Sequence, residues 1–269
     1  MRIVIDRLRN DARLLSVGGA ISFRALFNWM SPWIYVPSLL LAPIFQILLF
    51  AYLGRGAGVG DDQFYVVGNA VQYSAIPCLF AMGQTVAGER QNQTLGLVLT
   101  SPAARIPLFV GRSIPVIVNG WITTLVSLLV GGLLLGVTFA PSELAGIALV
   151  LLVASASCTG LGLVLAAIDL RVREGAVINN IVFGFLLLFT GANIALSTLP
   201  GWMAHVGGVL PLTHAIEASR QLAAGRSLGS VGGLVGKELG IGLVCVLVGL
   251  LALRLMEESS RRRATLELL

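Results

Sequence analysis

The segment LAGIALVLLVASASCTGLGLVLAAI, residues 144–168, contains no Asp, Glu, Lys or Arg. It is longer than the roughly 20 residues that a helix needs to cross the hydrocarbon layer of a membrane. Its apolar residues are continuous and do not alternate with polar ones, which favours a transmembrane helix over a strand of a β-barrel. We therefore interpret 144–168 as a transmembrane span.

Five other intervals of the chain are also free of charged residues: 25–54, 63–88, 113–142, 175–216 and 239–253. The interval 175–216 is too long for one span and predicts a helix followed by a loop. The last interval is short, so its helix is expected to begin a turn earlier, with Lys237 and Glu238 at the membrane interface. Together the pattern predicts six transmembrane helices, at about 30–54, 64–87, 113–137, 144–168, 176–197 and 233–255.

The composition also indicates an integral membrane protein. The chain is 56% hydrophobic and 12% charged, its mean hydropathy is +0.90, and an ordinary soluble domain carries about 25% charged residues. No low-complexity tract or separate soluble domain is evident. We expect one all-α integral membrane domain over 1–269.

The basic residues predict the orientation of the spans. With six spans the termini share one side, and all but four of the 18 basic residues fall on it, the exceptions being Arg55, Arg220, Arg226 and Lys237. Both termini and the loop at 88–112 are therefore expected to be cytoplasmic. This asymmetry accounts for the net charge of +5, so binding to nucleic acid need not be invoked.

The N-terminal residues 1–24 are basic and partly amphipathic, which predicts a helix lying in the plane of the inner membrane face. A solvated basic tail is the alternative. A cleaved signal peptide is not expected, because arginines continue to Arg24 and the following apolar run is much longer than a signal sequence requires.

Motifs for catalysis or cofactor binding are not found. The sequence has no G-x-x-x-x-G-K-[ST] phosphate loop, and the nearest match, at 236–238, lacks both the leading glycine and the hydroxyl residue. His205 and His214 have no cysteine near them in sequence and make a weak metal site. We expect no catalytic, cofactor-binding or metal-binding residues in this chain.

Carriers driven by protons or sodium usually place an ionisable residue at membrane depth. The first five spans offer only neutral polar side chains. This pattern disfavours an ion-coupled secondary transporter, which is one alternative function; a non-transport membrane scaffold or membrane enzyme is the other. If the protein is a pump, its energy is expected to come from elsewhere.

The stretch GERQNQTLGLVLTSPAAR, residues 88–105, stands between two apolar spans. It predicts a short cytoplasmic helix that ends at Pro102 and carries an apolar stripe of Leu95, Val98 and Leu99, at spacing i, i+3 and i+4. Such a stripe suits docking into the groove of a partner. The alternative is an interfacial helix that rests on lipid.

Residues 88–112 resemble the hallmark region of the ABC type-2 transporter permeases, the membrane subunits of drug, lipo-oligosaccharide and polysaccharide exporters. In that family a pattern close to E-R-x-x-x-T-L-E-x-L-L-x-S-P follows the second span. Gly96 stands here where the family often has an acidic residue. The matching residues are Glu89, Arg90, Thr94, Leu95, Val98, Leu99, Ser101 and Pro102.

A second segment, LPLTHAIEASRQLAAG at 210–225, is similar to the N-P-L-T-H-x-x-E-x-x-R segment of the same family, with Leu210 in place of Asn. We expect a short amphipathic helix over 211–224, lying against the outer leaflet. Ile216 and Leu222 should then be buried, and Glu217 and Arg220 exposed to water. The segments DLRVREGAVIN (169–179) and LPGWM (199–203) also fit, so the resemblance covers essentially the whole chain.

The resemblance implies an ABCG-like fold with the in-plane helix, six spans, a coupling helix at about 88–101, and a partly re-entrant outer segment at 198–230. It also implies a second permease, identical or paralogous, and two copies of a separate ATPase subunit that bind ATP and Mg. The chain would then be a multi-pass permease of a prokaryotic plasma membrane that exports a drug, lipid, peptide or glycan.

The resemblance further implies that the coupling helix contacts the ATPase, through Glu89, Arg90, Leu95, Val98 and Leu99. Arg171 and Arg173 are expected to form a smaller contact, or alternatively a solvated loop. For the translocation path, polar side chains of spans one, two and five are the candidates, although each could instead join two helices by a hydrogen bond. These are Gln46, Asn69, Gln72, Tyr73, Asn179 and Asn193. The repeat of Gly232, Gly236 and Gly240 predicts close helix packing.

Overall fold

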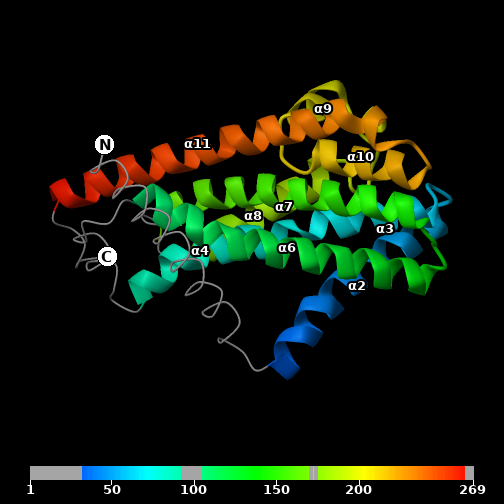
Figure 1. Ribbon diagram of the computed structural model, residues 1–269, viewed down its shortest axis with the longest axis horizontal. Coiled ribbons are helices and arrows are strands. Elements are labelled where there is room, and N and C mark those ends of the chain that lie inside the picture. The colour runs from blue at the N-terminus through cyan, green and yellow to red at the C-terminus, as the bar shows by residue number, and fades with distance from the viewer. Residues whose placement is uncertain (1–31, 92–104, 170–171, 173–174, 264–269) are drawn as a thin grey trace, which may run out of the picture.

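The computed structural model describes residues 32–91, 105–169, 172 and 175–263. Every regular element within these ranges is helical, and most of the long helices run side by side in one bundle (Figure 1). An all-helical class is therefore confirmed. The in-plane helix expected over 1–24 lies outside the described residues, as does most of the coupling helix expected over 88–101.

Five stretches are long and apolar enough to cross a membrane, and a sixth apolar helix, α8, is shorter. The stretches are Leu40–Ala57, Asp62–Gly83, Val110–Leu135, Pro141–Asp169 and Leu228–Leu255. The five stretches lie on α2 (Pro32–Ala57), α3 (Asp62–Tyr73), α4 (Ala75–Gln91), α6 (Arg105–Leu135), α7 (Pro141–Asp169) and α11 (Gly232–Arg263), and the shorter helix α8 is Gly175–Phe189.

The second expected span consists of two helices, α3 and α4, which are separated at Ser74. Pro77 explains the break, because its nitrogen has no hydrogen to donate to the carbonyl of Tyr73, four residues earlier. At the break the hydroxyl and the backbone N–H of Ser74 both donate to the carbonyl of Val71, at 2.8 and 3.1 Å.

The helix expected over 176–197 ends early, at Phe189. A helix of 15 residues is about 22 Å long, which is shorter than the roughly 30 Å of the hydrocarbon layer. Gly191 follows with φ of +83°, in the left-handed region that ends a helix. The chain then forms a bend at 190–194, a short 3-10 helix η1 (Leu196–Thr198) and α9 (Gly201–Gly208).

The segment before α11 packs at one end of the bundle, where Figure 1 shows α9 and α10 in yellow and orange. It contains α10 (Thr213–Ala223) and a 3-10 helix, η2 (Leu228–Val231). Ile216 and Leu222 are buried and Glu217 is exposed, as expected. α10 is packed among α3, α7 and α11, and its expected position against the outer leaflet stays a prediction.

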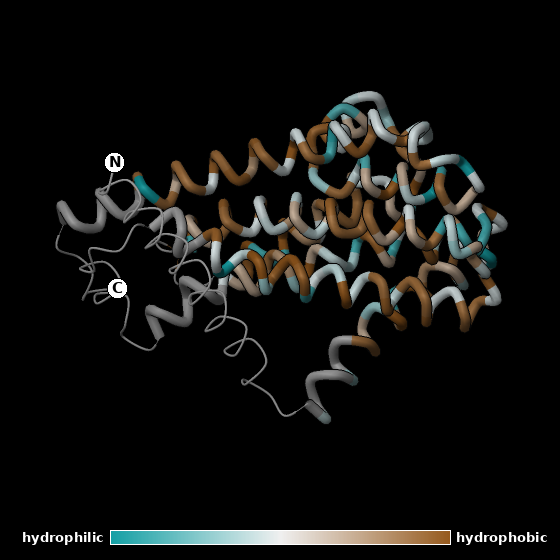
Figure 2. Tube along the Cα trace, in the orientation of Figure 1, coloured by the Kyte–Doolittle hydropathy of each residue, from teal (hydrophilic) through white to brown (hydrophobic). Residues whose placement is uncertain are grey.

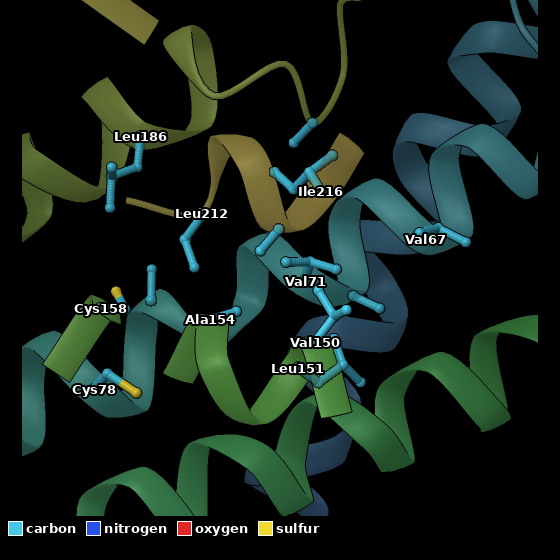
Figure 3. Close-up of a cluster of buried hydrophobic side chains, with 14 of the residues drawn as sticks. Val67, Val71, Cys78, Val150, Leu151, Ala154, Cys158, Leu186, Leu212 and Ile216 are labelled. Atoms are coloured by element: carbon cyan, nitrogen blue, oxygen red, sulfur yellow. The ribbon is translucent and has the colours of Figure 1, made fainter. Parts of the chain in front are cut away.

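The core of the bundle forms around α7, which packs against α4, α6, α8, α10 and α11. Figure 3 shows the buried side chains that converge there, among them Val71 of α3, Cys158 of α7 and Ile216 of α10. None of these three side chains is more than 1% exposed. Helices α3, α7 and α10 therefore share one apolar core.

Glycines bring α7 and α11 into close contact. A Cβ at Gly242 would lie 2.8 Å from the Cα of Ser157, and one at Gly160 would lie 2.8 Å from the carbonyl oxygen of Gly242. The packing expected at Gly232, Gly236 and Gly240 is not found within the described part of the chain, since a Cβ built at any of them meets no atom of another element within 4 Å. A repeat of small residues identifies a helix face only when a neighbouring helix covers that face.

The outer surfaces of α2, α6 and α11 are apolar, as the brown outer face of α11 in Figure 2 shows. Leu133 of α6 is 81% exposed, and Leu243 and Leu247 of α11 are also exposed. The N-terminal half of α2 leaves the bundle (Figure 1). An apolar surface of this extent fits a protein that is surrounded by lipid.

Candidate functional site

Three of the side chains expected along the translocation path form one chain of hydrogen bonds. Gln46 Nε2 of α2 donates to Asn69 Oδ1 of α3 at 3.1 Å, and Asn69 Nδ2 donates to Asn193 Oδ1 at 2.9 Å. Asn69 is fully buried, whereas Gln46 and Asn193 are partly exposed. The amides therefore join α2, α3 and the segment after α8 through the interior of the bundle.

Gln72 lies close to this chain, on the next turn of α3. Its Oε1 accepts a 2.8 Å hydrogen bond from the hydroxyl of Thr190, directly after α8, and its Nε2 has no hydrogen-bond partner among the described residues. Tyr73 is 6% exposed. The structure thus gathers five of the six path candidates on α2, α3 and the 190–193 segment, and their role in transport stays a prediction.

Asn179 is separate from that group, on α8 near Asp169, the last residue of α7. A Cβ at Gly83 of α4 would lie 2.6 Å from Asp169 Oδ2 and 2.9 Å from Asn179 Nδ2. Both side chains are buried, at 5% and 3% exposure. They mark a polar junction of α4, α7 and α8 at the end of the bundle opposite α10.

Arg220 of α10 was expected in water, and that expectation is wrong. Its Nη1 donates to the carbonyl of Gly191 at 2.8 Å, and its Nη2 donates to the carbonyl of Ala192 at 2.7 Å. Nη2 also lies 3.2 Å from the carbonyl oxygen of Phe64, whose ring is 3.4 Å from the guanidinium carbon. The sequence spacing could have predicted this burial, because Arg220 follows the buried Ile216 by four residues and so shares its helix face.

Burial has an electrostatic consequence for Arg220. Removal from water lowers the pKa of the guanidinium to about 10, against a weaker opposing effect of the Glu217 carboxylate. The side chain nevertheless stays charged at neutral pH. Its charge is balanced by the carbonyls beyond the C-terminus of α8, which is the negative end of that helix.

Glu238 of α11 is the second buried charge that sequence reasoning missed. The carboxylate is 0% exposed, and it accepts the backbone N–H of Leu212 at 2.8 Å and that of Ala215 at 3.3 Å. Its position four residues before Gly242 places it on the face of α11 that meets α7. Glu238, expected at the membrane interface, is instead buried inside the bundle, whereas Lys237 is exposed and its expected interfacial position stays a prediction.

The residues expected to couple the chain to an ATPase are described only in part. Glu89 and Arg90 lie in the last turn of α4, which continues without a break from Ala75 to Gln91. The remaining members lie outside the described residues, namely Leu95, Val98, Leu99, Arg171 and Arg173. Their role stays a prediction. Among the described residues, no three His, Cys, Asp or Glu side chains lie together as metal ligands would.

A family model for the ABC-2 type transporter matches residues 19–223. The chain belongs to the ABC-2 type transporter family. The match includes the amide chain on α2 and α3 and extends through α10. The resemblance seen in the sequence motifs is thereby confirmed.

Curated relatives support the same assignment to the family. The "Daunorubicin resistance ABC transporter permease protein DrrB1" of Streptomyces coeruleorubidus is 24% identical over 233 residues, which are 84% of this chain and 82% of the relative. The "Probable multidrug ABC transporter permease YbhR" of Escherichia coli K12 is 23% identical over 164 residues, 60% of this chain. The aligned region is only 44% of that relative's length.

Proposed function

We propose that this chain is the membrane-spanning permease subunit of an ATP-driven exporter, energised by a separate ATPase subunit. The family match over 19–223 is the observation that carries the proposal. The sequence offers no phosphate loop of its own, which is consistent with that division of labour. Because the relatives are named as permeases for multidrug transport and daunorubicin resistance, a drug-like small molecule is the first substrate class to test.

In this proposal two permeases, identical or paralogous, pair in the plasma membrane of a prokaryote, and each contacts one of two ATPase subunits. The contact is the segment at about 88–101, which follows directly on α4. ATP-driven closure of the ATPases biases the bundle only if this contact differs between the two states. The continuous helix from Ala75 to Gln91 supports such a role, because a rigid element can carry a displacement into the bundle.

The buried acid Glu238 requires the alternative of an ion-coupled carrier to be considered again. Glu238, however, uses both carboxylate oxygens to accept backbone N–H groups, from Leu212 immediately before α10 and from Ala215 in the first turn of α10. A coupling ion must be able to bind and leave, and a carboxylate held by two backbone donors is suited to a structural role. ATP therefore remains the proposed source of energy.

The test is to express the chain together with its proposed ABC ATPase subunit and to measure daunorubicin accumulation in a host sensitive to the drug. We expect the pair to lower accumulation, and an ATPase variant that binds but does not hydrolyse ATP to abolish the effect. Export that disappears with a protonophore while ATP is maintained would instead support an ion-coupled carrier. Absence of export in the presence of a folded, ATP-hydrolysing complex would reject the drug substrate.

A further inference from the structure

The 190–193 segment is non-helical backbone inside the bundle. Thr190 is 1% exposed and Ala192 is 0% exposed, although the helix before them is too short to cross the hydrocarbon layer. Carbonyls beyond the end of a helix have no partner within that helix. Irregular backbone at membrane depth is tolerated only where protein or a water-filled cavity surrounds it.

Two helices of the bundle supply partners for this segment. From α3, Gln72 accepts the Thr190 hydroxyl and Asn69 donates to the side chain of Asn193. From α10, Arg220 donates to the two intervening carbonyls. The contacts from α3 engage side chains, whereas Arg220 engages the backbone itself.

The site of Arg220 is closely fitted. A Cβ at Gly68 of α3 would lie 2.3 Å from the carbonyl oxygen of Ala192 and 2.5 Å from Arg220 Nη2, so only glycine leaves room there. The guanidinium also lies over the ring of Phe64, in cation–π geometry. Among the described residues, no carboxylate lies within ion-pair distance of Arg220. Carbonyl groups and an aromatic ring are therefore its partners.

We propose that Arg220 is a positioning residue for transport, which keeps the α10 end of the bundle closed by holding the 190–193 segment against α10 and α3. The inference rests on the proposed function and deepens it. Hydrogen bonds to backbone carbonyls can be exchanged for bonds to water with little change in apolar contact. The segment can thus separate from α10 while the apolar core around α7 stays packed.

The closing contact predicts a change in accessibility that can be measured without any transport. Ala192→Cys places a thiol in the segment, and the native Cys158, 0% exposed in the core, reports on general loosening. The complete complex is reconstituted without nucleotide in nanodiscs, where both membrane faces meet a water-soluble maleimide. Labelling of each cysteine is then quantified by peptide mass spectrometry.

With Arg220 present we expect little labelling of the cysteine at 192. Arg220→Gln should raise its labelling rate at least about tenfold, because a hydrogen bond to a charged group contributes about a tenfold factor or more to an equilibrium. Arg220→Lys keeps the charge and should restore part of the protection. Labelling of Cys158 should not change.

Arg226→Gln is the matched control, since Arg226 is exposed just after the end of α10 and its Nη1 lies 3.4 Å from Gln221 Oε1. It should leave labelling at 192 unchanged. Equal labelling with and without Arg220 would overturn the proposal, and so would parallel labelling of Cys158, which would mean general unfolding. If the folded, ATP-hydrolysing complex with Arg220 fails to export daunorubicin, the drug substrate is rejected, and the labelling contrast is still decided separately.

Discussion

The carboxylate of Glu238 accepts a 2.8 Å hydrogen bond from the backbone N–H of Leu212, 26 residues earlier in the chain. Leu212 has φ of +77°, a left-handed conformation that is unfavourable for a leucine. It is the residue immediately before α10, so the acid neutralises the positive end of that helix. Through this contact α11 fixes the start of α10, and Arg220 then fixes the 190–193 segment from the other end of α10.

Glu238→Ala should lower the thermal stability of the purified protein. The substitution leaves the N–H groups of Leu212 and Ala215 buried without an acceptor, at a cost of about 1–3 kcal/mol each. Glu238→Gln keeps one acceptor and should cost less. Lys237→Ala, at the exposed neighbouring position, should leave the melting temperature in detergent nearly unchanged. Equal melting temperatures for the alanine variants at 237 and 238 would contradict a structural role for the acid.

Asn69→Leu distinguishes the two roles considered for the amide chain, which are lining the translocation path and joining helices by hydrogen bonds. The variant removes the amide that bonds to Gln46, Asn193 and the carbonyl of Tyr65, so we expect a loss of stability of about 0.6–2 kcal/mol. Asn180→Leu is a matched control, because the Asn180 amide is exposed and donates only to the carbonyl of Ala176 within α8. Thermal melting measures both. An unchanged melting temperature together with an altered range of exported drugs would support the path role instead.

Gly242→Ala tests the contact of α7 with α11. The new methyl would lie 2.8 Å from the Cα of Ser157, which belongs to the backbone and cannot rotate away. Overpacking of this kind costs about 1–3 kcal/mol. Gly240→Ala has open space at the same helix depth and should melt like the parent protein. A variant at 242 that melts no lower than the one at 240 would show that the helices separate easily.

Leu99→Asp tests the coupling helix inferred from the sequence. An aspartate in a dry contact with the ATPase costs several kcal/mol, so ATP-dependent export and drug-stimulated ATP hydrolysis should both be lost. Insertion into the membrane should persist because the change lies outside the spans. Leu97→Asp lies off the apolar stripe and should retain more activity. Full export by the variant at 99 would mean that the helix only rests on lipid.

Cysteines placed at Gln93 and Ser227 test the orientation of the spans. In a background without Cys78, Cys158 and Cys245, an impermeant maleimide added to intact cells should label position 227 and not position 93. After the cells are opened, both positions should react. Labelling of both positions from outside would reject the six-span arrangement with cytoplasmic termini.

The sequence determined the helical class and most of the long helices of this protein. Inside lipid each backbone group must find its partner within its own helix, so continuous apolar runs such as 144–168 leave only one structure open to them. The same principle explains the limits of the sequence. The helix at 176–197 is predicted as one piece because no charged residue interrupts it. Nothing in that pattern reveals that a side chain of α10 bonds to the carbonyls of Gly191 and Ala192.

Tertiary structure alone decided the roles of Arg220 and Glu238. Their partners include backbone groups of Gly191, Ala192, Leu212 and Ala215, which lie 23 to 29 residues away in the chain. Backbone N–H and C=O groups are the same in nearly every residue, so no pattern of side chains identifies which of them stay unpaired at a helix end. Only the packing of α10 against α3, α7 and α11 brings each charge to the helix end that balances it.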